Sequence, residues 1–274
     1  MARPSILYVT DLTYPARGRR YGDEDVHLSA ALRTDFAVAL CHPLDAAGLM
    51  GSFDGVVVRN SGPVLHYQEQ YEAFRAEALL RGTPVFNELT GRADMAGKQY
   101  LLDLSAGGHP VIPTAGAPDE LHRLPEVPEY VVKPKLGADS IGLEFVGPER
   151  IAEACAGGGV LVQPRIDFRY EVSFYFVDRE FQYALHAPDR DARWELAPYR
   201  PGGDDLAFAQ HFVDWNTIDH GIQRVDACRT PEGELLLVEL EDLNPYLSLH
   251  LLEDGQRERF TAATKDSLHR LLRG

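Results

Sequence analysis

Two short patterns of charged residues stand in the last quarter of the chain, Arg224-Val-Asp226 and Glu239-Leu-Glu241. The charged residues of each pattern are two positions apart, so both would lie on one face of a strand. Carboxylates gathered on one face repel one another unless a cation lies between them. Magnesium takes oxygen ligands at about 2.1 Å and shares them with phosphate groups. The patterns therefore predict a magnesium site if the chain folds them together, and a solvent-exposed strand end if it does not.

A turn sequence between the two patterns favours pairing. Residues 230–234 read Thr-Pro-Glu-Gly-Glu, with Pro and Gly at positions that suit a turn. We therefore expect a hairpin of strands 222–229 and 234–241, with a loop at 231–234, so that residue 230 pairs with residue 235.

This register makes Asp226 face Glu239 and makes Arg224 face Glu241, with opposite side chains about 5 Å apart. Arg224 offsets part of the charge of the three acids, and metal ions would offset the rest. The apolar residues of the hairpin are expected on the opposite face: Val225, Val238 and Leu240.

A second candidate feature is a lysine at the end of an apolar strand. Lys133 ends the run Val-Val-Lys-Pro at 131–134, and the loop that follows contains Gly137, Ser140 and Gly142. Small residues let backbone N–H groups approach phosphate oxygens, and the lysine adds positive charge. An ordinary connecting loop is the alternative. Lys98, near Leu101 and Leu102, is on its own equally compatible with a surface lysine whose stem covers apolar neighbours.

The remaining pattern indicates an α/β N-terminal domain followed by two α+β lobes. Apolar strands at 5–9, 54–58 and 83–86 and a helix at 67–81 alternate in the first part, which favours three layers. We place the domain boundaries at 1–92, 93–163 and 164–274. Further elements are expected as helices at 94–106, 148–156, 203–215 and 256–272, strands at 130–134, 143–146 and 160–163, and a hairpin of 170–177 with 180–186.

Composition narrows the classes of partner. The chain has 274 residues, 45% of them hydrophobic, and a formal net charge of −15, which argues against a nucleic-acid surface. No apolar run reaches the roughly 20 residues that a membrane span needs, and the first residues lack the pattern of a signal peptide. Three cysteines far apart in the chain predict free thiols and a cytoplasmic location.

Several motifs together carry a resemblance to a known family. Lys98, the 131–134 strand with its glycine loop, Val-Gln-Pro-Arg-Ile at 162–166, Glu-Val-Ser at 171–173 and the two charged patterns occur in the order and spacing of ATP-grasp enzymes. The chain resembles the glutathione-synthetase-like branch, and within it the D-cycloserine-forming cyclo-ligases. The resemblance runs from about Asp54 to Leu249, and it implies an ATP-grasp fold of two lobes that clamp the nucleotide.

The resemblance also implies roles for individual residues. Lys98, Lys133 and the loop with Ser140 would hold ATP; Gln163, Arg165 and Ile166 would form the hinge that reads adenine, and Glu171 would bind the ribose. Asp226, Glu239 and Glu241 would ligate two magnesium ions, for which Mn²⁺ can substitute. Arg224 and Arg193 would contact the transferred phosphoryl group, and Gly202 and Gly203 would lie near the substrate.

One departure from the family pattern concerns the second metal ion. The family's usual metal asparagine is replaced by Glu241, and Asn244 follows three residues later as an alternative ligand.

Two residues at the end of the 54–58 strand are candidates for substrate binding. Arg59 and Asn60 stand where α/β sheets place ligands. A domain-interface ion pair is the alternative for Arg59.

The implied chemistry is ligation of a small carboxylate to an amine through an acyl phosphate, between two molecules or within one. No protein nucleophile is needed, in agreement with the lack of a Ser-His-Asp or Cys-His pattern. Two alternatives use the same nucleotide site. A phosphotransferase would need a phosphoryl-accepting histidine on a swivelling domain, and a non-catalytic regulator would be expected to lose metal acids or Arg224. A homodimer is compatible with the sequence.

Overall fold

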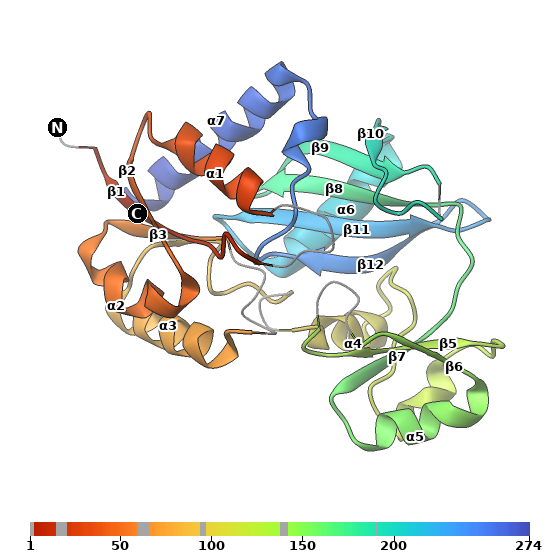
Figure 1. The fold of residues 1–274 in the computed structure, drawn as a ribbon. Coiled ribbons are helices and arrows are strands. Elements are labelled where there is room, and N and C mark those ends of the chain that lie inside the picture. Colours follow the sequence, from red (N-terminus) through yellow and green to blue (C-terminus); the bar gives the residue numbers. More distant parts are fainter. Residues whose placement is uncertain (1–2, 15–20, 60–65, 94–96, 138–141, 190) are drawn as a thin grey trace.

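The structure is a computed structural model. It describes residues 3–14, 21–59, 66–93, 97–137, 142–189 and 191–274 (Figure 1). Three β-sheets organise these residues, and they follow one another along the chain. Short 3-10 turns join several elements, at Pro43–Asp45, Met50–Ser52, Pro118–Arg123, Pro148–Arg150 and Leu249–Leu251.

The first sheet is parallel and has the strand order β2-β1-β3-β4. Its strands are β1 (Ser5–Val9), β2 (Ala37–Cys41), β3 (Gly55–Val58) and β4 (Val85–Phe86). Helix α1 (Tyr21–Leu32) packs on one face, while α2 (Ala46–Leu49) and α3 (Gln68–Arg81) pack on the other. The sheet is covered on both sides, as the apolar strands predict. Helix α3 ends at Gly82, whose φ of 63° is in the left-handed region that terminates helices.

A small antiparallel sheet follows, with the order β6-β5-β7. It consists of β5 (Tyr130–Pro134), β6 (Glu144–Val146) and β7 (Val160–Pro164), and α5 (Ile151–Ala156) packs against it. In Figure 1 this lobe stands apart from the rest of the molecule. The strands predicted for this part of the chain are all confirmed to within one residue.

The third sheet is antiparallel, with the order β10-β9-β8-β11-β12. Its strands are β8 (Tyr170–Val177), β9 (Glu180–Ala187), β10 (Ala197–Tyr199), β11 (Ile222–Arg229) and β12 (Leu235–Glu241). Helices α4 (Gln99–Ala106) and α6 (Gly203–Asn216) supply apolar side chains to the core on one face. The predicted hairpin of β8 and β9 is confirmed, and Asp178 adopts the left-handed backbone that its turn requires, with φ 57°.

The last helix, α7 (Asp254–Leu271), returns to the start of the chain and packs against α1. Phe260 and Leu268 of α7 share one core with Leu28 and Leu32 of α1. The same core includes residues of β1 and of β8 and β9, so the first sheet and the third sheet meet through it. The predicted domain boundaries at residues 92 and 163 stay a proposal.

The charged hairpin has the expected residue pairs at the end away from its turn, where the acids lie, and different pairs near the turn. Arg224 pairs with Glu241 and Asp226 with Glu239, as predicted. A β-bulge then shifts the register, because Ala227 pairs with Leu237 and Arg229 with Leu235. The predicted pairing of residues 230 and 235 is therefore wrong, and the loop is one residue longer.

The bulge also corrects the predicted orientation of Val238. As the extra residue in β12, Val238 lines the same pocket as Glu239 instead of facing the opposite core. Val225 and Leu240 are fully buried in that core, as predicted.

Several elements differ from the sequence prediction. Helix α4 begins at Gln99, so Lys98 lies just before it instead of inside it, and residues 94–96 lie outside the described part of the chain. Helices α1 and α2 and strands β2 and β10 were not predicted. Among the described helices, none is long and apolar enough to cross a membrane.

Candidate active site on the antiparallel sheet

A pocket of about 490 Å³ lies on the face of the third sheet opposite α4 and α6. Side chains of β8, β11 and β12 form its floor, the segment 193–196 forms one side, and the segment after β12 forms another. The floor is rigid because β8 and β11 are paired along their whole lengths in the middle of the sheet. Such a frame holds charged side chains in fixed relative positions.

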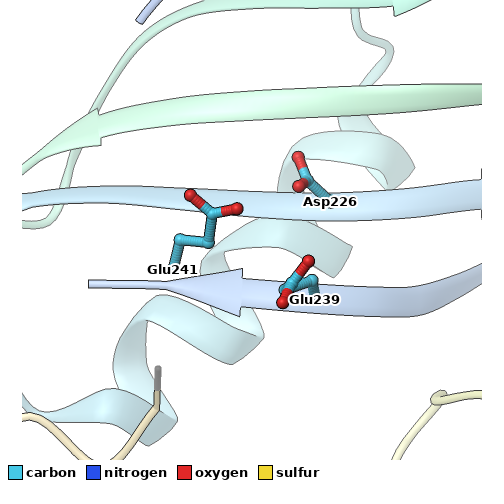
Figure 2. A group of neighbouring side chains, drawn as sticks. All are labelled: Asp226, Glu239 and Glu241. Atoms are coloured by element: carbon cyan, nitrogen blue, oxygen red, sulfur yellow. The ribbon is translucent and has the colours of Figure 1, made fainter. Parts of the chain in front are cut away.

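Three carboxylates meet on this floor, as the hairpin pattern predicted. Asp226, Glu239 and Glu241 each offer an oxygen, and these oxygens lie within 4.8 Å of one another. Figure 2 shows the three side chains on the neighbouring strands β11 and β12, all on the same face of the sheet. The donor set is oxygen only and partly buried, which suits Mg²⁺ or Mn²⁺. The residues present therefore fit the metal ions that the sequence predicted.

Two cations neutralise most of this negative charge. Arg224 donates to Asp226 at 2.8 and 3.1 Å and also to Glu241. Lys98, buried at the start of α4, forms an ion pair with Glu239. The partnership between Lys98 and a metal acid was not predicted, because the sequence does not reveal that α4 packs beside β12. Three acids and two cations leave one formal negative charge.

Arg224 is held in place by contacts on several sides. Its side chain is largely buried, and it also donates to the carbonyl oxygen of Tyr246 at 3.1 Å. Burial lowers the pKa of Arg224, but Asp226 and Glu241 outweigh burial and raise that pKa well above its ordinary value. Arg224 therefore stays a cation facing the pocket.

Lys133, which the sequence predicts to bind phosphate, lies on β5. Burial, together with the nearby charges of Lys98 and Arg193, lowers the pKa of Lys133 to about 7. Three cations from different parts of the chain thus come close enough to influence one another. An arriving anion such as a phosphate group would relieve this repulsion.

Arg193 and Glu171 meet at the edge of the pocket. Arg193 Nε donates to Glu171 Oε2 at 3.0 Å, and both residues line the pocket. Glu171 belongs to β8, and Arg193 belongs to the segment before β10. The predicted ribose-binding and phosphate-binding residues are therefore neighbours.

The predicted hinge residues lie where β7 leads to β8. Gln163 is buried, and its amide donates to Thr114 Oγ1 at 2.8 Å. Arg165 pairs with Glu129 at the surface of the small lobe, and Ile166 is half-buried. The side chains of Gln163 and Arg165 thus bind within the small lobe, and the predicted part of this segment in reading adenine stays a proposal.

Arg59 does not reach the pocket as a substrate-binding side chain. Its guanidinium is fully buried, 3.2 Å from Asp25, and it donates to the carbonyl oxygen of Pro245 at 2.9 Å. The prediction of direct substrate contact is therefore wrong for Arg59. The alternative of a domain-interface ion pair holds only in part, because the ion pairs stay within the predicted N-terminal domain and the contact beyond it is the hydrogen bond to Pro245.

Gly202 and Gly203 are also away from the pocket. Gly202 caps the N-terminus of α6 through Asp205, and both glycines are exposed. Asn244 is buried just beyond β12, and its part in metal binding stays a proposal. Asn60 and Ser140 lie outside the described residues.

Several pocket residues were not predicted. Ser173 donates to Asp226 at 2.6 Å and fixes that carboxylate. Tyr175, Tyr246, Ser248 and His250 also line the pocket. Ser173 and Tyr175 follow Glu171 at steps of two along β8, so strand alternation could have placed them on the same face.

A second hollow of about 270 Å³ adjoins the pocket. The two share Tyr246 and His250, and the second is also lined by Asp23 and His27 of α1 and by Arg257 of α7. The pocket therefore borders a second, polar hollow that is lined by residues of α1 and α7.

Comparison with known proteins bears on what this arrangement is. The chain is 26% identical over 277 aligned residues to the cycloserine biosynthesis protein DcsG of Streptomyces lavendulae, covering 88% of this chain and 92% of that protein. Its fold matches the crystal structure of the D-cycloserine synthetase DcsG with a TM-score of 0.73 and 25% identity, over 97% of this chain and 100% of the other. These matches support an ATP-grasp ligase.

More distant structures share the fold of this chain. The D-alanine–D-alanine ligase of Bacillus anthracis, complexed with ATP, matches with a TM-score of 0.63 at 12% identity, over 99% of this chain and 97% of the other. The ATP-grasp ligase PsnB, complexed with a precursor variant, Mg and ADP, matches with a TM-score of 0.63 at 15% identity, over 98% of this chain and 99% of the other. No family model matches the chain. The predicted fold class is confirmed, and the likeness to these ligases supports the predicted ATP-dependent ligase.

Proposed function

We propose that this ATP-grasp ligase joins the carboxylate of a small amino-acid-like substrate to an amine, through an acyl-phosphate intermediate. The observation that carries the proposal is the grouping of Asp226, Glu239 and Glu241 around Arg224 on one pocket floor. A non-catalytic regulator has no need of this grouping. The amine belongs either to a second molecule or to the same molecule, in which case a ring closes.

The proposed reaction has two steps. A carboxylate oxygen of the substrate attacks the γ-phosphorus of ATP, so that an O–P bond forms and the bond to the β,γ-bridging oxygen breaks to release ADP. The amine then attacks the acyl carbon, a C–N bond forms, and the C–O bond to phosphate breaks. The amine gives up a proton, and inorganic phosphate leaves.

Residues of this chain have defined tasks in these steps. Asp226, Glu239 and Glu241 would hold two magnesium ions, with Asn244 as a further candidate ligand and with Mn²⁺ as a substitute. Those ions supply neutralisation of phosphate charge when bound. Arg224 points into the pocket as a permanent cation and stabilises the negative oxygens of the transferred group. Lys98, Lys133 and Arg193 bring further positive charge to the phosphates, and Glu171 is placed to bind the ribose.

The size and position of the pocket support a small substrate. Its volume is about 490 Å³, and the adjoining hollow adds about 270 Å³. The relative DcsG is named for cycloserine biosynthesis, which agrees with a substrate of amino-acid size. We further propose that the enzyme is cytoplasmic.

A phosphate-release screen tests this function. Purified protein is mixed with ATP, magnesium and a matrix of amino acids, other carboxylic acids and amines, and ADP, phosphate and new amide products are measured. We expect one combination to yield ADP, phosphate and amide in equal amounts, and Asp226→Asn to abolish all three. ATP turnover without any amide, or turnover that survives in Asp226→Asn, would contradict the proposal.

A further inference from the structure

The segment 245–249, which we call the substrate wall, forms the side of the pocket beyond β12. Tyr246 and Ser248 of this segment line the pocket together with Arg224 and the metal-binding acids. The wall has no regular secondary structure before Leu249, and Ser248 has a φ of 52°. An irregular segment with one left-handed residue keeps its shape only if other groups hold its backbone.

The N-terminal domain supplies two of these groups. Glu24, near the start of α1, accepts hydrogen bonds from the backbone N–H groups of Leu247 at 2.8 Å and Leu249 at 3.0 Å, one on each carboxylate oxygen. Arg59, at the end of β3, donates to the carbonyl oxygen of Pro245 at 2.9 Å. The wall is thus bonded at residues 245, 247 and 249 by side chains that lie almost two hundred positions or more earlier in the chain.

These two side chains form part of one buried charged cluster. Arg59 lies 3.2 Å from Asp25 and 3.9 Å from Glu24, and all three side chains are at most 5% exposed. Asp25 in turn accepts from the hydroxyl groups of Tyr8 on β1 and of Thr10 just after it. Buried charges are costly unless they are paired, so the cluster fixes the positions of Glu24 and Arg59 relative to the sheet.

Two more bonds come from the third sheet. Arg224 donates to the carbonyl oxygen of Tyr246 at 3.1 Å, and Tyr183 on β9 donates to that of Leu247 at 2.7 Å. Because Arg224 also holds Asp226 and Glu241, the wall and the metal-binding acids share one guanidinium. The position of the wall relative to the reacting phosphate is therefore set jointly by the N-terminal domain and by Arg224.

We propose that Glu24 and Arg59 are positioning residues that hold the substrate wall at the distance the carboxylate or amine substrate requires. The inference rests on the proposed ligase function. Neither residue belongs to the group that we assign to ATP, so their loss acts on the acid or amine substrate and leaves nucleotide binding intact. The role also explains why Arg59 stands at the ligand-binding edge of the first sheet without entering the pocket.

The central variant is Glu24→Gln. It keeps the shape of the side chain, but an amide has only one oxygen and so accepts properly from only one of the two wall N–H groups. The matched control is Asp178→Asn. Asp178 is also a buried carboxylate that accepts a backbone N–H, from Gly221 at 3.0 Å, and pairs with an arginine, Arg270, but it lies away from the pocket.

Steady-state kinetics with the acid and amine found in the screen measure the effect on the reaction. We expect Glu24→Gln to lower kcat/KM for the acid or amine by about 10- to 100-fold, because a misplaced binding surface has effects of that size. The loss should appear mainly as a raised KM, since the wall touches substrate before and during reaction. The KM for ATP should change less than about 3-fold, and Asp178→Asn should change neither KM, although it too loses stability.

Hydrogen exchange gives a readout that needs no turnover. Faster exchange of the amides of Leu247 and Leu249 in Glu24→Gln, but not in Asp178→Asn, supports the wall contact. An unchanged exchange rate overturns the inference. So does an equal effect of Glu24→Gln and Asp178→Asn on the substrate KM, because that outcome means a general loss of stability.

Two further cases complete the test. If Glu24→Gln does not fold, Arg59→Lys, which keeps the charge and shortens the reach to Pro245, is measured in the same way and with the same expectations. If the parent enzyme turns over no carboxylate, the proposed function fails, and the exchange rates of the wall amides still decide whether Glu24 holds the wall.

Discussion

At the scale of residues, the pocket floor is organised by the pairing of each acid with a nearby cation. Glu239 pairs with Lys98, while Asp226 and Glu241 pair with Arg224. The sequence suggested three acids that repel one another with only Arg224 to relieve them. The structure shows that Lys98 relieves them as well, and this changes the expected effect of removing one acid.

Replacing Glu239 with Gln tests this pairing. Without magnesium, the simple repulsion argument predicts equal or higher stability. Because Lys98 is buried and loses its partner, we expect instead a decrease of about 1 kcal/mol in the free energy of unfolding. Catalysis should fall by orders of magnitude through loss of a metal ligand. Urea unfolding without magnesium and the ligase assay measure both effects.

Glu234→Gln is the matched control, since Glu234 lies exposed in the turn of the same hairpin. It should leave stability and activity close to those of the parent. A Glu239→Gln protein that is more stable than the parent would show that repulsion outweighs the ion pair with Lys98.

The low pKa of Lys133 predicts proton uptake when ATP binds. With a pKa of about 7, Lys133 is largely neutral at pH 8, and the phosphates of ATP would raise that pKa. Binding at pH 8 should therefore take up close to one proton, and binding at pH 6 much less. Calorimetry in two buffers of different ionisation enthalpy measures the uptake. Lys133→Met should bind ATP more weakly and without this uptake, so equal uptake by both proteins would be contrary to the assignment.

The lowered pKa of Lys133 also predicts whether the free energy of unfolding rises or falls with pH. The value for Lys133 is lowered from 10.5 to about 7 in the folded protein, so the unfolded state binds more protons between those two pH values. The contribution of Lys133 to the free energy of unfolding therefore rises with pH across that window. Lys133→Met should lack this component when the two proteins are compared by urea unfolding at pH 7 and pH 9.

At the scale of elements, the β-bulge in β12 is the feature that adapts the hairpin to its surroundings. β12 is an edge strand, and its outer side is covered by the segment 110–112 and by α4. The backbone N–H of Leu237 donates to Pro110, and that of Leu240 donates to the hydroxyl of Tyr100. Regular alternation would turn the N–H of residue 239 outward; the extra residue turns that of residue 240 outward instead.

Tyr100→Phe removes the partner of the Leu240 N–H. An unpaired buried N–H costs about 1 to 3 kcal/mol, so the free energy of unfolding should fall by that amount. Because Leu240 lies between Glu239 and Glu241, we also expect a higher magnesium concentration for half-maximal activity. Tyr130→Phe, which removes a buried hydroxyl bond to Pro125 in the small lobe, should reduce stability without changing the magnesium requirement. If both variants needed the same magnesium concentration, the prediction would be wrong, and the bulge would have no influence on the metal site.

The hairpin also illustrates what local sequence can and cannot predict. The pairing of Asp226 with Glu239 was predicted correctly, because it follows from the alternation of side chains along a strand and from the turn sequence, which are both local properties. The bulge depends on Tyr100 and Pro110, which meet β12 only in the folded chain, so no pattern within the hairpin reveals it. Arg59 was misassigned for the same reason, because its partners Glu24 and Pro245 are far away in sequence. Helix α1 was missed because its buried polar residues, Glu24 and Asp25, interrupt the apolar stripe that marks a helix.

At the scale of the whole molecule, the proposed nucleotide site collects residues from separate parts of the fold. Lys133 comes from the small lobe, Lys98 from the approach to α4, and Glu171 and the metal-binding acids from the third sheet. A nucleotide that contacts all of them links the small lobe to the rest of the protein. Binding energy of this kind adds directly to the stability of the native state.

Thermal unfolding with a non-hydrolysable ATP analogue and magnesium tests the link. At about 100 times the dissociation constant, binding should add about 2.7 kcal/mol to the free energy of unfolding. Lys133→Met should show a smaller gain at the same concentration. No shift in the parent at millimolar nucleotide would argue against a bridging site.

The return of α7 to the first sheet has a consequence for how the protein is made. Phe260 and Leu268 complete the core that Ile6, Leu28 and Leu32 begin, so the N-terminal sheet is synthesised well before these packing partners in α7. While the ribosome is still adding the metal-binding hairpin, one face of the N-terminal sheet is exposed to water. Exposed apolar surface of this kind makes a nascent chain prone to aggregation. Chaperones that shield this face until α7 emerges should therefore raise the yield of active enzyme.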